Sequence, residues 1–195
     1  MIDENSTLED VCFEVSSALD AASIDAVLTG GSAASIYAPN VYTSFDADFV
    51  FRRAPRNAEL QRVLAELSYR KSRTGGMFEH PNSKYTIDFP RGPLAVGGDY
   101  VQETTTLERG PQRLRILTPT DSVKDRLAHF FHWDDHTALE AAVGIAQSSH
   151  GSDVNYEDIA RWTERESASG TDFRPKLEQF FGRAGVDGRS LRPGS

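Results

Sequence analysis

The sequence predicts an α/β fold, of the α+β kind: a small mixed β-sheet flanked by helices, with a C-terminal helical extension. Two observations lead to this prediction. Up to residue 117, short strand-like segments alternate with amphipathic helical segments, and beyond that point only helical periodicity is found. In addition, 195 residues suffice for one sizeable core with a helical appendage.

The first elements are a helix, a buried strand and a second helix. The first helix has an apolar stripe of Leu8, Val11, Cys12, Val15 and Leu19. Residues 26–29 are typical of a short buried strand, and residues 32–37 of a helix. Gly30 and Gly31 therefore form the turn, where glycine permits a positive φ and close approach of another group.

Two further strands carry carboxylates. In residues 45–51, Asp46 and Asp48 are two apart and share one face, while Phe45, Ala47, Phe49 and Phe51 share the other. In residues 84–89, Asp88 lies on the face opposite to Tyr85, Ile87 and Phe89. If the two strands are neighbours with their apolar faces on the core, the three aspartates converge.

The remaining elements complete the sheet and the extension. A helix is expected with Pro55 in its first turn. Strands are expected near residues 77–79, 100–107 and 113–116. Thr118 followed by Pro119 is typical of a helix start. Further helices are expected over residues 137–148, after a cap at Asn155, and over residues 173–181. The predicted regions are a core (1–117), a helical region packed on it (118–182) and a disordered tail (183–195).

The acidic residues and the glycine turn indicate a particular chemistry. Three converging carboxylates repel one another unless a cation lies between them. Mg²⁺ is the expected cation, because it binds carboxylates and substrate phosphates and needs no histidine or cysteine. The helix that starts at Gly30-Gly31-Ser32 offers N–H groups and a partial positive charge, which suit a triphosphate.

The chain has, in this order, a strand, Gly-Gly-Ser, a helix, an Asp-x-Asp strand and a strand with a single Asp. This arrangement resembles the minimal nucleotidyltransferases of the DNA polymerase beta superfamily. Residues 44–48, Ser-Phe-Asp-Ala-Asp, are similar to the Thr-x-Asp-x-Asp of small AbiEii-type proteins. Residues 117–127 resemble the helix that follows the core in those proteins. The resemblance covers most of residues 8–167.

The resemblance implies an enzyme that moves a nucleoside monophosphate from an NTP to a hydroxyl group and releases pyrophosphate. It implies that two Mg²⁺ ions are held with the NTP, and that the acceptor is an RNA end such as tRNA, a protein side chain or a small molecule. It also implies a toxin–antitoxin component with a protein partner. The residues to which it assigns roles are Asp46, Asp48 and Asp88 for catalysis and metal binding, and Gly30, Gly31, Ser32 and Lys124 for nucleotide binding.

One alternative belongs to another functional class. A catalytically degenerate protein of this fold would bind nucleotide or a partner without transfer, and Tyr42 and Ala47, which depart from the usual pattern, favour it. An isolated Asp-x-Asp also occurs on solvated strand faces, in phosphatases and in glycosyltransferases. Only the ordered combination with the glycine turn and Asp88 favours the nucleotidyltransferase hypothesis.

Composition and charge argue against several kinds of binding site and against a membrane segment. A net charge of −8 argues against sequence-independent nucleic-acid binding by the whole surface, although residues 51–126 carry 14 Lys/Arg against nine Asp/Glu. With no apolar span and an acidic, polar start, we expect a cytoplasmic protein without a membrane segment. Cys12 is expected to be packed in a helix. His129, His132 and His136 fall at helical spacing, but His129 and His132, which share a face, lack the four-residue spacing of a helical zinc site, so a polar helix face or an edge of the nucleotide cleft is expected.

Overall fold

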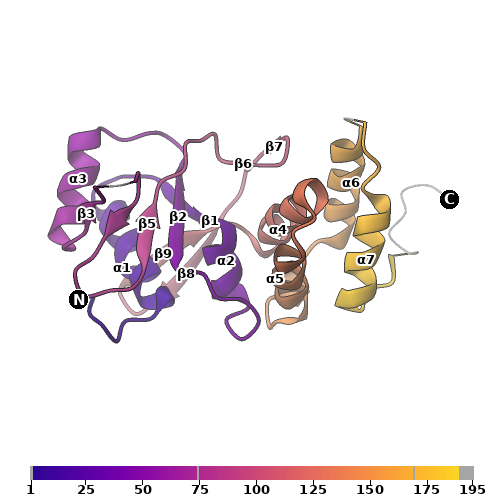
Figure 1. Cartoon of the computed structure of the whole chain (residues 1–195), viewed down its shortest axis with the longest axis horizontal. Helices are drawn as coiled ribbons and strands as arrows, with labels where there is room; N and C mark the ends of the chain where they lie inside the picture. The colour runs from indigo at the N-terminus through magenta and orange to yellow at the C-terminus, as the bar shows by residue number, and fades with distance from the viewer. Residues whose placement is uncertain (1, 74, 169, 189–195) are drawn as a thin grey trace. The chain divides into compact units, whose positions relative to one another are not determined.

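A computed structural model of the chain, which describes residues 2–73, 75–168 and 170–188, shows two compact units (Figure 1). The first unit comprises residues 1–33, 43–94 and 101–117, and the second comprises residues 34–42, 95–100 and 118–195. The segments 34–42 and 95–100, which the sequence analysis placed in the core, thus group with the helical unit.

A mixed β-sheet forms the centre of the first unit. Its strand order is β3-β4-β5-β2-β1-β9-β8, and the pairs β2–β5 and β1–β9 are parallel whereas the other pairs are antiparallel. The strands are β1 (Ala26–Thr29), β2 (Asp46–Phe51), β3 (Arg70–Lys71), β4 (Phe78–Glu79), β5 (Thr86–Asp88), β8 (Thr105–Arg109) and β9 (Gln112–Ile116). The predicted α/β class with a small mixed sheet is confirmed.

Helices α1 (Leu8–Ala21) and α3 (Asn57–Glu66) belong to the same unit, and α1 packs on β1 and β9. A capping box starts α1, in which Thr7 accepts from the Asp10 N–H and the Asp10 carboxylate accepts from the Thr7 N–H. The Cys12 thiol is buried in this helix, and burial raises its pKa well above the usual range. As expected, Cys12 is a packing residue.

Three predicted boundaries differ in the structure. Helix α3 begins at Asn57, so Pro55 precedes the helix rather than lying in its first turn. Helix α2 (Gly30–Tyr37) includes both glycines of the expected turn. The strand expected over residues 100–107 is divided, because residues 99–100 form β7, which pairs with β6 (Ala95–Val96) in a separate hairpin.

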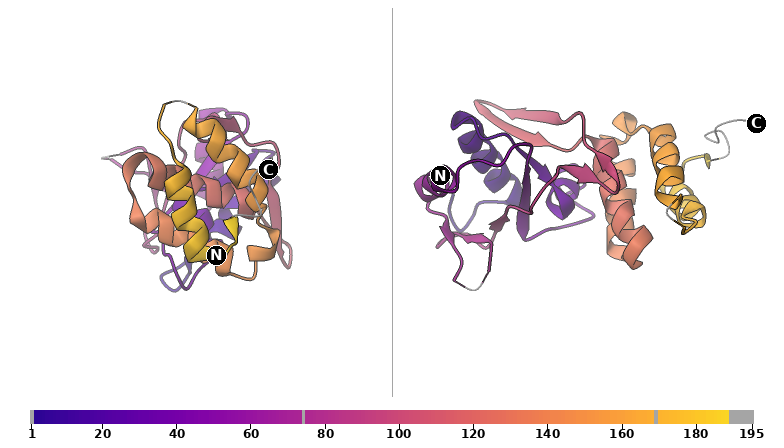
Figure 2. Two further views of the ribbon diagram at one scale, coloured as in Figure 1. Left: turned by 90° about the vertical axis from the view of Figure 1, so that its right-hand side faces the viewer. Right: turned by 90° about the horizontal axis from the view of Figure 1, so that it is seen from above.

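The second unit is mainly helical (Figure 2). Its helices are α4 (Pro119–Trp133), α5 (His136–Gln147), α6 (Tyr156–Ser167) and α7 (Arg174–Ala184), with a short 3₁₀ turn, η1 (Gly151–Asp153). The predicted caps are confirmed: Thr118 accepts from the Asp121 N–H, and Asn155 accepts from the Asp158 N–H. Stacked aromatic rings of Phe131 and Trp162 join α4 to α6 in the core.

The last helix extends beyond its predicted end. It runs to Ala184 and closes with Gly185 at a φ of 76°, so residues 183 and 184 are helical rather than part of a tail. The rest of the predicted tail includes residues 189–195, which lie outside the described residues. None of the helices in the described ranges combines the length and apolar character that crossing a membrane requires.

We predict that the first unit loses stability in mild acid because of His80. His80 is buried, packs against Tyr69 with the two rings tilted by 52°, and accepts the Asn82 N–H at Nδ1 over 3.1 Å. Burial lowers the pKa of His80 below its usual 6.5, so the unfolded chain binds this proton more readily. The stabilisation is therefore complete above pH 6.5 and is lost as pH falls through the folded-state pKa.

Urea unfolding of wild type and His80→Gln between pH 7.5 and 5 tests this prediction. At pH 7.5 the free energy of unfolding of the variant should be lower by about 1 kcal/mol, because one hydrogen bond is lost. Between pH 7.5 and 5 its free energy of unfolding should fall less steeply than that of wild type. The exposed His136 offers a matched control, and we expect His136→Gln to keep the wild-type decline. An unchanged decline in His80→Gln would show that another group causes it.

Candidate functional site

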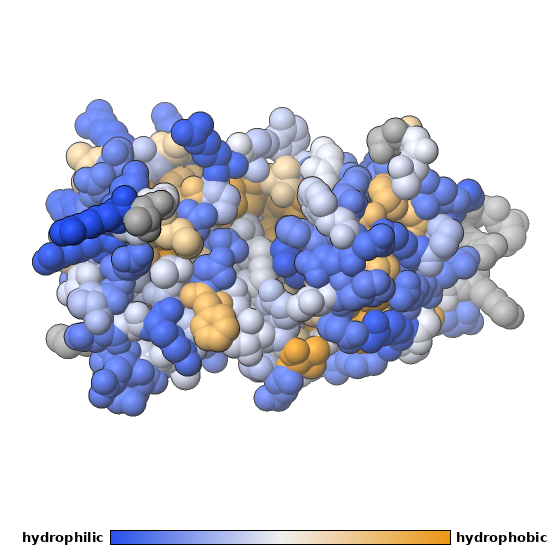
Figure 3. Space-filling view, viewed as in Figure 1, coloured by the Kyte–Doolittle hydropathy of each residue, from blue (hydrophilic) through white to orange (hydrophobic). Residues whose placement is uncertain are grey.

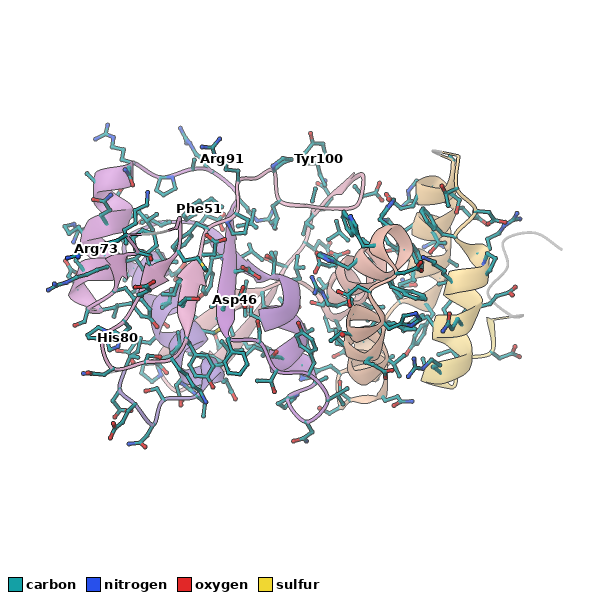
Figure 4. The ribbon with its side chains drawn as sticks, viewed as in Figure 1. Asp46, Phe51, Arg73, His80, Arg91 and Tyr100 are labelled. Carbon is teal, nitrogen blue, oxygen red and sulfur yellow. The ribbon has the colours of Figure 1, made fainter. Side chains whose placement is uncertain are left out.

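The register of β2 and β5 brings the predicted carboxylates onto neighbouring strands. In this parallel pair, Asp48 lies opposite Asp88 and Asp46 lies opposite Thr86. Adjacent strands are about 4.8 Å apart, so Asp48 and Asp88 are side by side, with Asp46 two residues earlier on the same face. Figure 4 shows Asp46 on β2 within the first unit.

The alternation predicted from the sequence holds over residues 46–49 and 86–88 but ends at Val50, which is buried, and Phe51, which is only half-buried. Asp46, Asp48 and Asp88 are partly exposed, whereas Ala47 and Ile87 between them are fully buried. Ala47 therefore belongs to the core and not to the carboxylate face. Phe45 is an exception, because it precedes β2 and 62% of it is exposed, although it was expected on the buried face.

Local hydrogen bonds orient two of the carboxylates. The Ser44 hydroxyl donates to Oδ1 of Asp46 over 2.9 Å. The Phe89 N–H donates to Oδ1 of Asp88 over 2.8 Å. Each bond fixes one carboxylate oxygen from within its own strand segment, which limits the rotation of the side chain before any ligand binds.

Asp48 is placed by the glycine turn. Gly30 has a φ of 67°, and a Cβ atom on it would lie 2.6 Å from Oδ2 of Asp48. Glycine is required here for two reasons, since the conformation is left-handed and the space is occupied by the carboxylate. The start of α2 and the Asp48 carboxylate are thus in direct contact.

Ser32 connects the same two elements from the inside. It is fully buried, donates to the Thr29 carbonyl over 2.8 Å, and accepts from the Asp48 N–H over 3.1 Å. The hydroxyl was expected to contact phosphate. In the structure the first turn of α2 points this side chain into the core. The hydroxyl joins β1 to β2 there, because it donates its proton to Thr29 and accepts from Asp48.

Lys124, the remaining predicted nucleotide contact, lies in the second unit. Its ammonium group is buried and forms ion pairs with Asp121, over 3.3 Å, and with Asp158. The pair with Asp158 joins α4 to α6, so Lys124 has a structural role in its own unit. The sequence did not indicate this pairing, because Asp158 is 34 residues away.

The residues at the site fit Mg²⁺ by donor type. The face offers carboxylate oxygens and no imidazole or thiolate, which is the donor set of a hard cation. In the described ranges, no three His, Cys, Asp or Glu side chains lie close enough together to form a metal cluster. The register therefore aligns the three aspartates on one face, whereas the expected convergence of all three into one cluster is not found among the described residues.

The histidines of α4 also form no such cluster within the described residues. His132 lies 3.4 Å from the Glu166 carboxylate, and burial lowers the pKa of His129. Thr86 was not singled out from the sequence. It is the register partner of Asp46, its N–H donates to the main-chain carbonyl of Phe45, and its hydroxyl contacts Sδ of Met77. Only the strand pairing identifies it.

Solved structures with a similar fold are nucleotidyltransferase-like. An antigenic nucleotidyltransferase-like protein from Paracoccidioides brasiliensis shares 14% identity at a TM-score of 0.58, over 90% of this chain and 94% of its own. The antibiotic-resistance factor ANT(2″)-Ia shares 16% identity at a TM-score of 0.51, over 80% of this chain and 90% of its own. Neither protein-family models nor curated proteins give a match to the sequence. The chain thus has the fold of nucleotidyltransferase-like proteins.

The contact between Gly30 and Asp48 yields a testable prediction. Gly30→Ala should destabilise the protein by about 1–2 kcal/mol through its left-handed backbone, and by an additional amount because the new methyl group displaces the Asp48 carboxylate. Gly110→Ala is a matched control in the same unit, with a φ of 58° but no atom within 4 Å of its Cβ. Urea unfolding of wild type and both variants gives the difference between the two losses in free energy of unfolding.

The excess destabilisation of Gly30→Ala over Gly110→Ala measures the clash with Asp48. Adding Asp48→Gly to Gly30→Ala should remove that excess, because the carboxylate is then absent. Equal destabilisation in Gly30→Ala and Gly110→Ala would contradict the close approach.

Proposed function

We propose that this protein is a Mg²⁺-dependent nucleotidyltransferase that moves a nucleoside monophosphate from an NTP to a hydroxyl acceptor. The observation that carries the proposal is the alignment of Asp46, Asp48 and Asp88 on one sheet face, with Asp48 in contact with the glycine turn. The nucleotidyltransferase-like fold supports it. Carboxylates beside a helix start that accepts phosphates are the parts that this transfer needs.

The chemistry is an in-line displacement at the α-phosphorus. The acceptor oxygen forms a bond to that phosphorus, the bond to the oxygen bridging to the β-phosphorus breaks, and pyrophosphate leaves. Asp88 is the proposed base, which takes the proton of the acceptor hydroxyl; its Oδ1 is held by the Phe89 N–H. The start of α2, at Gly30 and Gly31, is the proposed seat of the β and γ phosphates.

Asp46, Asp48 and Asp88 are the residues that would hold Mg²⁺, with two ions proposed when an NTP is bound. Bound Mg²⁺ would supply stabilisation of charge on the attacking and leaving oxygens. The role proposed for Ser32 is to position Asp48, since its hydroxyl bonds to the Asp48 N–H. Lys124 is left out of the proposed site because its ammonium group is committed to Asp121 and Asp158.

A second candidate function is binding of nucleotide or of a protein partner without transfer, as in a toxin–antitoxin pair. One observation favours it: within the described part of the chain, the three aspartates are not gathered into a metal cluster. The identity of residue 47 does not support this second candidate. Ala47, which departs from the usual motif, is fully buried beneath the carboxylate face and does not change the groups that the face presents.

Asp48→Asn should abolish most of the transfer. The substitution keeps the size of the side chain and removes the charge, so turnover should fall roughly 100-fold or more. Labelled NTPs, Mg²⁺ and a cell extract provide the assay, with incorporation of label into RNA, protein or small molecules as the readout. Glu59→Gln on α3 removes one partly exposed acidic charge elsewhere in the same unit and should leave turnover unchanged.

Calorimetry with ATP, CTP, GTP and UTP, with and without Mg²⁺, separates the two candidates. Mg²⁺-dependent binding that Asp48→Asn weakens is expected of the enzyme. Binding that ignores Mg²⁺ would favour the non-catalytic candidate. Transfer that proceeds equally well in Asp48→Asn would contradict the proposed mechanism.

A further inference from the structure

The central sheet of the first unit has two outer strands, β3 and β8, whose free edges differ in character (Figure 1). Strand β3 consists only of Arg70 and Lys71, and both residues are exposed. Figure 3 shows a strongly hydrophilic surface over the end of the first unit that carries β3. Sheet edges that are short and charged resist pairing with another chain. The β3 edge is therefore protected.

The β8 edge lacks this protection. The strand has five residues, Thr105–Arg109, and each of them pairs with a residue of β9 without a bulge. It contains no proline and no lysine, the two residue types that commonly protect an edge, and the threonines of residues 104–106 favour extended backbone. Among the described residues, the main chain of β8 bonds only to β9. Its outer edge is thus a free template for another strand.

The two charged side chains of β8 are bound within the same unit. Glu108 pairs with Arg113 on β9 over 3.4 Å. Arg109 pairs with Asp10 over 2.8 Å, and its guanidinium carbon lies 4.5 Å from the centre of the Phe13 ring on α1. Charges on an edge strand oppose pairing when they are free to face the incoming strand. Here each charge has a partner of opposite sign, so the edge carries no uncompensated charge.

The turn between β8 and β9 determines which peptide groups face the free edge. The turn consists of Gly110 and Pro111, and Gly110 has a φ of 58°, which fits a type II′ turn. The residues that flank such a two-residue turn form a hydrogen-bonded pair, so Arg109 bonds to β9. Bonded and non-bonded pairs alternate along an antiparallel ladder. The N–H and C=O groups of Thr106 and Glu108 therefore point away from β9.

We propose that β8 pairs in antiparallel orientation with β8 of a second copy of this chain, about a twofold axis at Leu107. In this register Leu107 lies opposite Leu107 of the second copy. Thr106 then faces Glu108, and Thr105 faces Arg109, so all five residues of each strand are paired and no like charges are opposite one another. A shift of two residues toward the C-terminus would set Glu108 opposite itself, which is destabilising. The inference goes beyond the proposed function and does not depend on it.

This pairing satisfies the free edge and extends an apolar row across it. Thr106 and Glu108 of one copy exchange two main-chain hydrogen bonds with Glu108 and Thr106 of the other at each of two positions. On the opposite face, Leu107 is only half-buried, whereas Leu114, its partner on β9, is fully buried. The twofold axis sets Leu107 beside its copy, so the row continues from one Leu114 to the other. Covering the two Leu107 side chains favours association.

Sedimentation velocity of wild type over about 5–500 µM tests the association, because one strand pair is at the small end of specific interfaces. The dimer fraction should rise with concentration. Thr106→Pro removes an N–H that points to the free edge and leaves the β8–β9 ladder intact, so it should raise the dimer dissociation constant roughly ten-fold or more. Thr106→Val keeps the N–H and should associate as wild type does. Circular dichroism verifies that both variants fold.

Disulfide cross-linking tests the register and does not depend on the proline variant. Leu107 and its copy form a non-hydrogen-bonded pair, in which the Cα atoms are about 4.5 Å apart and within the range of a disulfide. Leu107→Cys should therefore cross-link to its copy under mild oxidation. Thr106→Cys is the matched control, because its copy lies diagonally at about 7–8 Å. Wild type should not cross-link, since Cys12 is fully buried.

Three results would overturn the inference. These are a wild type that stays monomeric over the whole concentration range, equal association of wild type and folded Thr106→Pro, and cross-linking of Thr106→Cys at least as fast as that of Leu107→Cys. Failure of the proposed function is seen separately, as absence of Mg²⁺-dependent NTP binding in calorimetry of wild type.

Discussion

The position of β2 between β1 and β5 determines the candidate site. Its antiparallel partner β1 sets Thr29 opposite Asp48, and its parallel partner β5 sets Asp88 opposite Asp48 on the other side. A slip of one residue in either pair would exchange the two faces, taking the carboxylates into the core and Ala47 out of it. The cost of burying charged groups therefore fixes the register, and the register aligns the aspartates.

The turn at Gly30 depends on the same pairing. Since β1 ends at Thr29 beside Asp48, the chain must leave the strand where the carboxylate already occupies space, and only a residue without Cβ fits. Ser32 then secures the arrangement from the buried side through Thr29 and Asp48. The contact that positions Asp48, a carboxylate proposed to bind metal, and the turn that forms the proposed phosphate seat are thus parts of one local structure.

Charge is used differently in the two units. In the second unit, Lys124, Arg165 and Lys176 each pair with an aspartate, so these cations stabilise the packing of helices and hairpin. In the first unit, most cations between residues 52 and 91 form no ion pair with a described residue. Exposed cations contribute little to stability on their own.

The sequence by itself determined the local features of this protein. Strand alternation predicted the shared face of Asp46 and Asp48, the two glycines marked the change from β1 to α2, and the caps Thr118 and Asn155 gave the starts of α4 and α6. Such features depend on neighbours within a few residues, which period and side-chain chemistry encode directly. The resemblance to nucleotidyltransferases also rested on the order of these local features.

Only the tertiary structure decided which residues from distant segments meet. It turned Ser32 from an expected phosphate ligand into a buried link to Asp48, paired Lys124 with Asp158, exposed Phe45, and made Thr86 the neighbour of Asp46. None of these outcomes follows from periodicity, because a side chain's partners are set by strand order and helix packing. Burial and long-range pairing are properties of the whole fold, and those properties distinguish a group that holds the site together from one that faces the substrate.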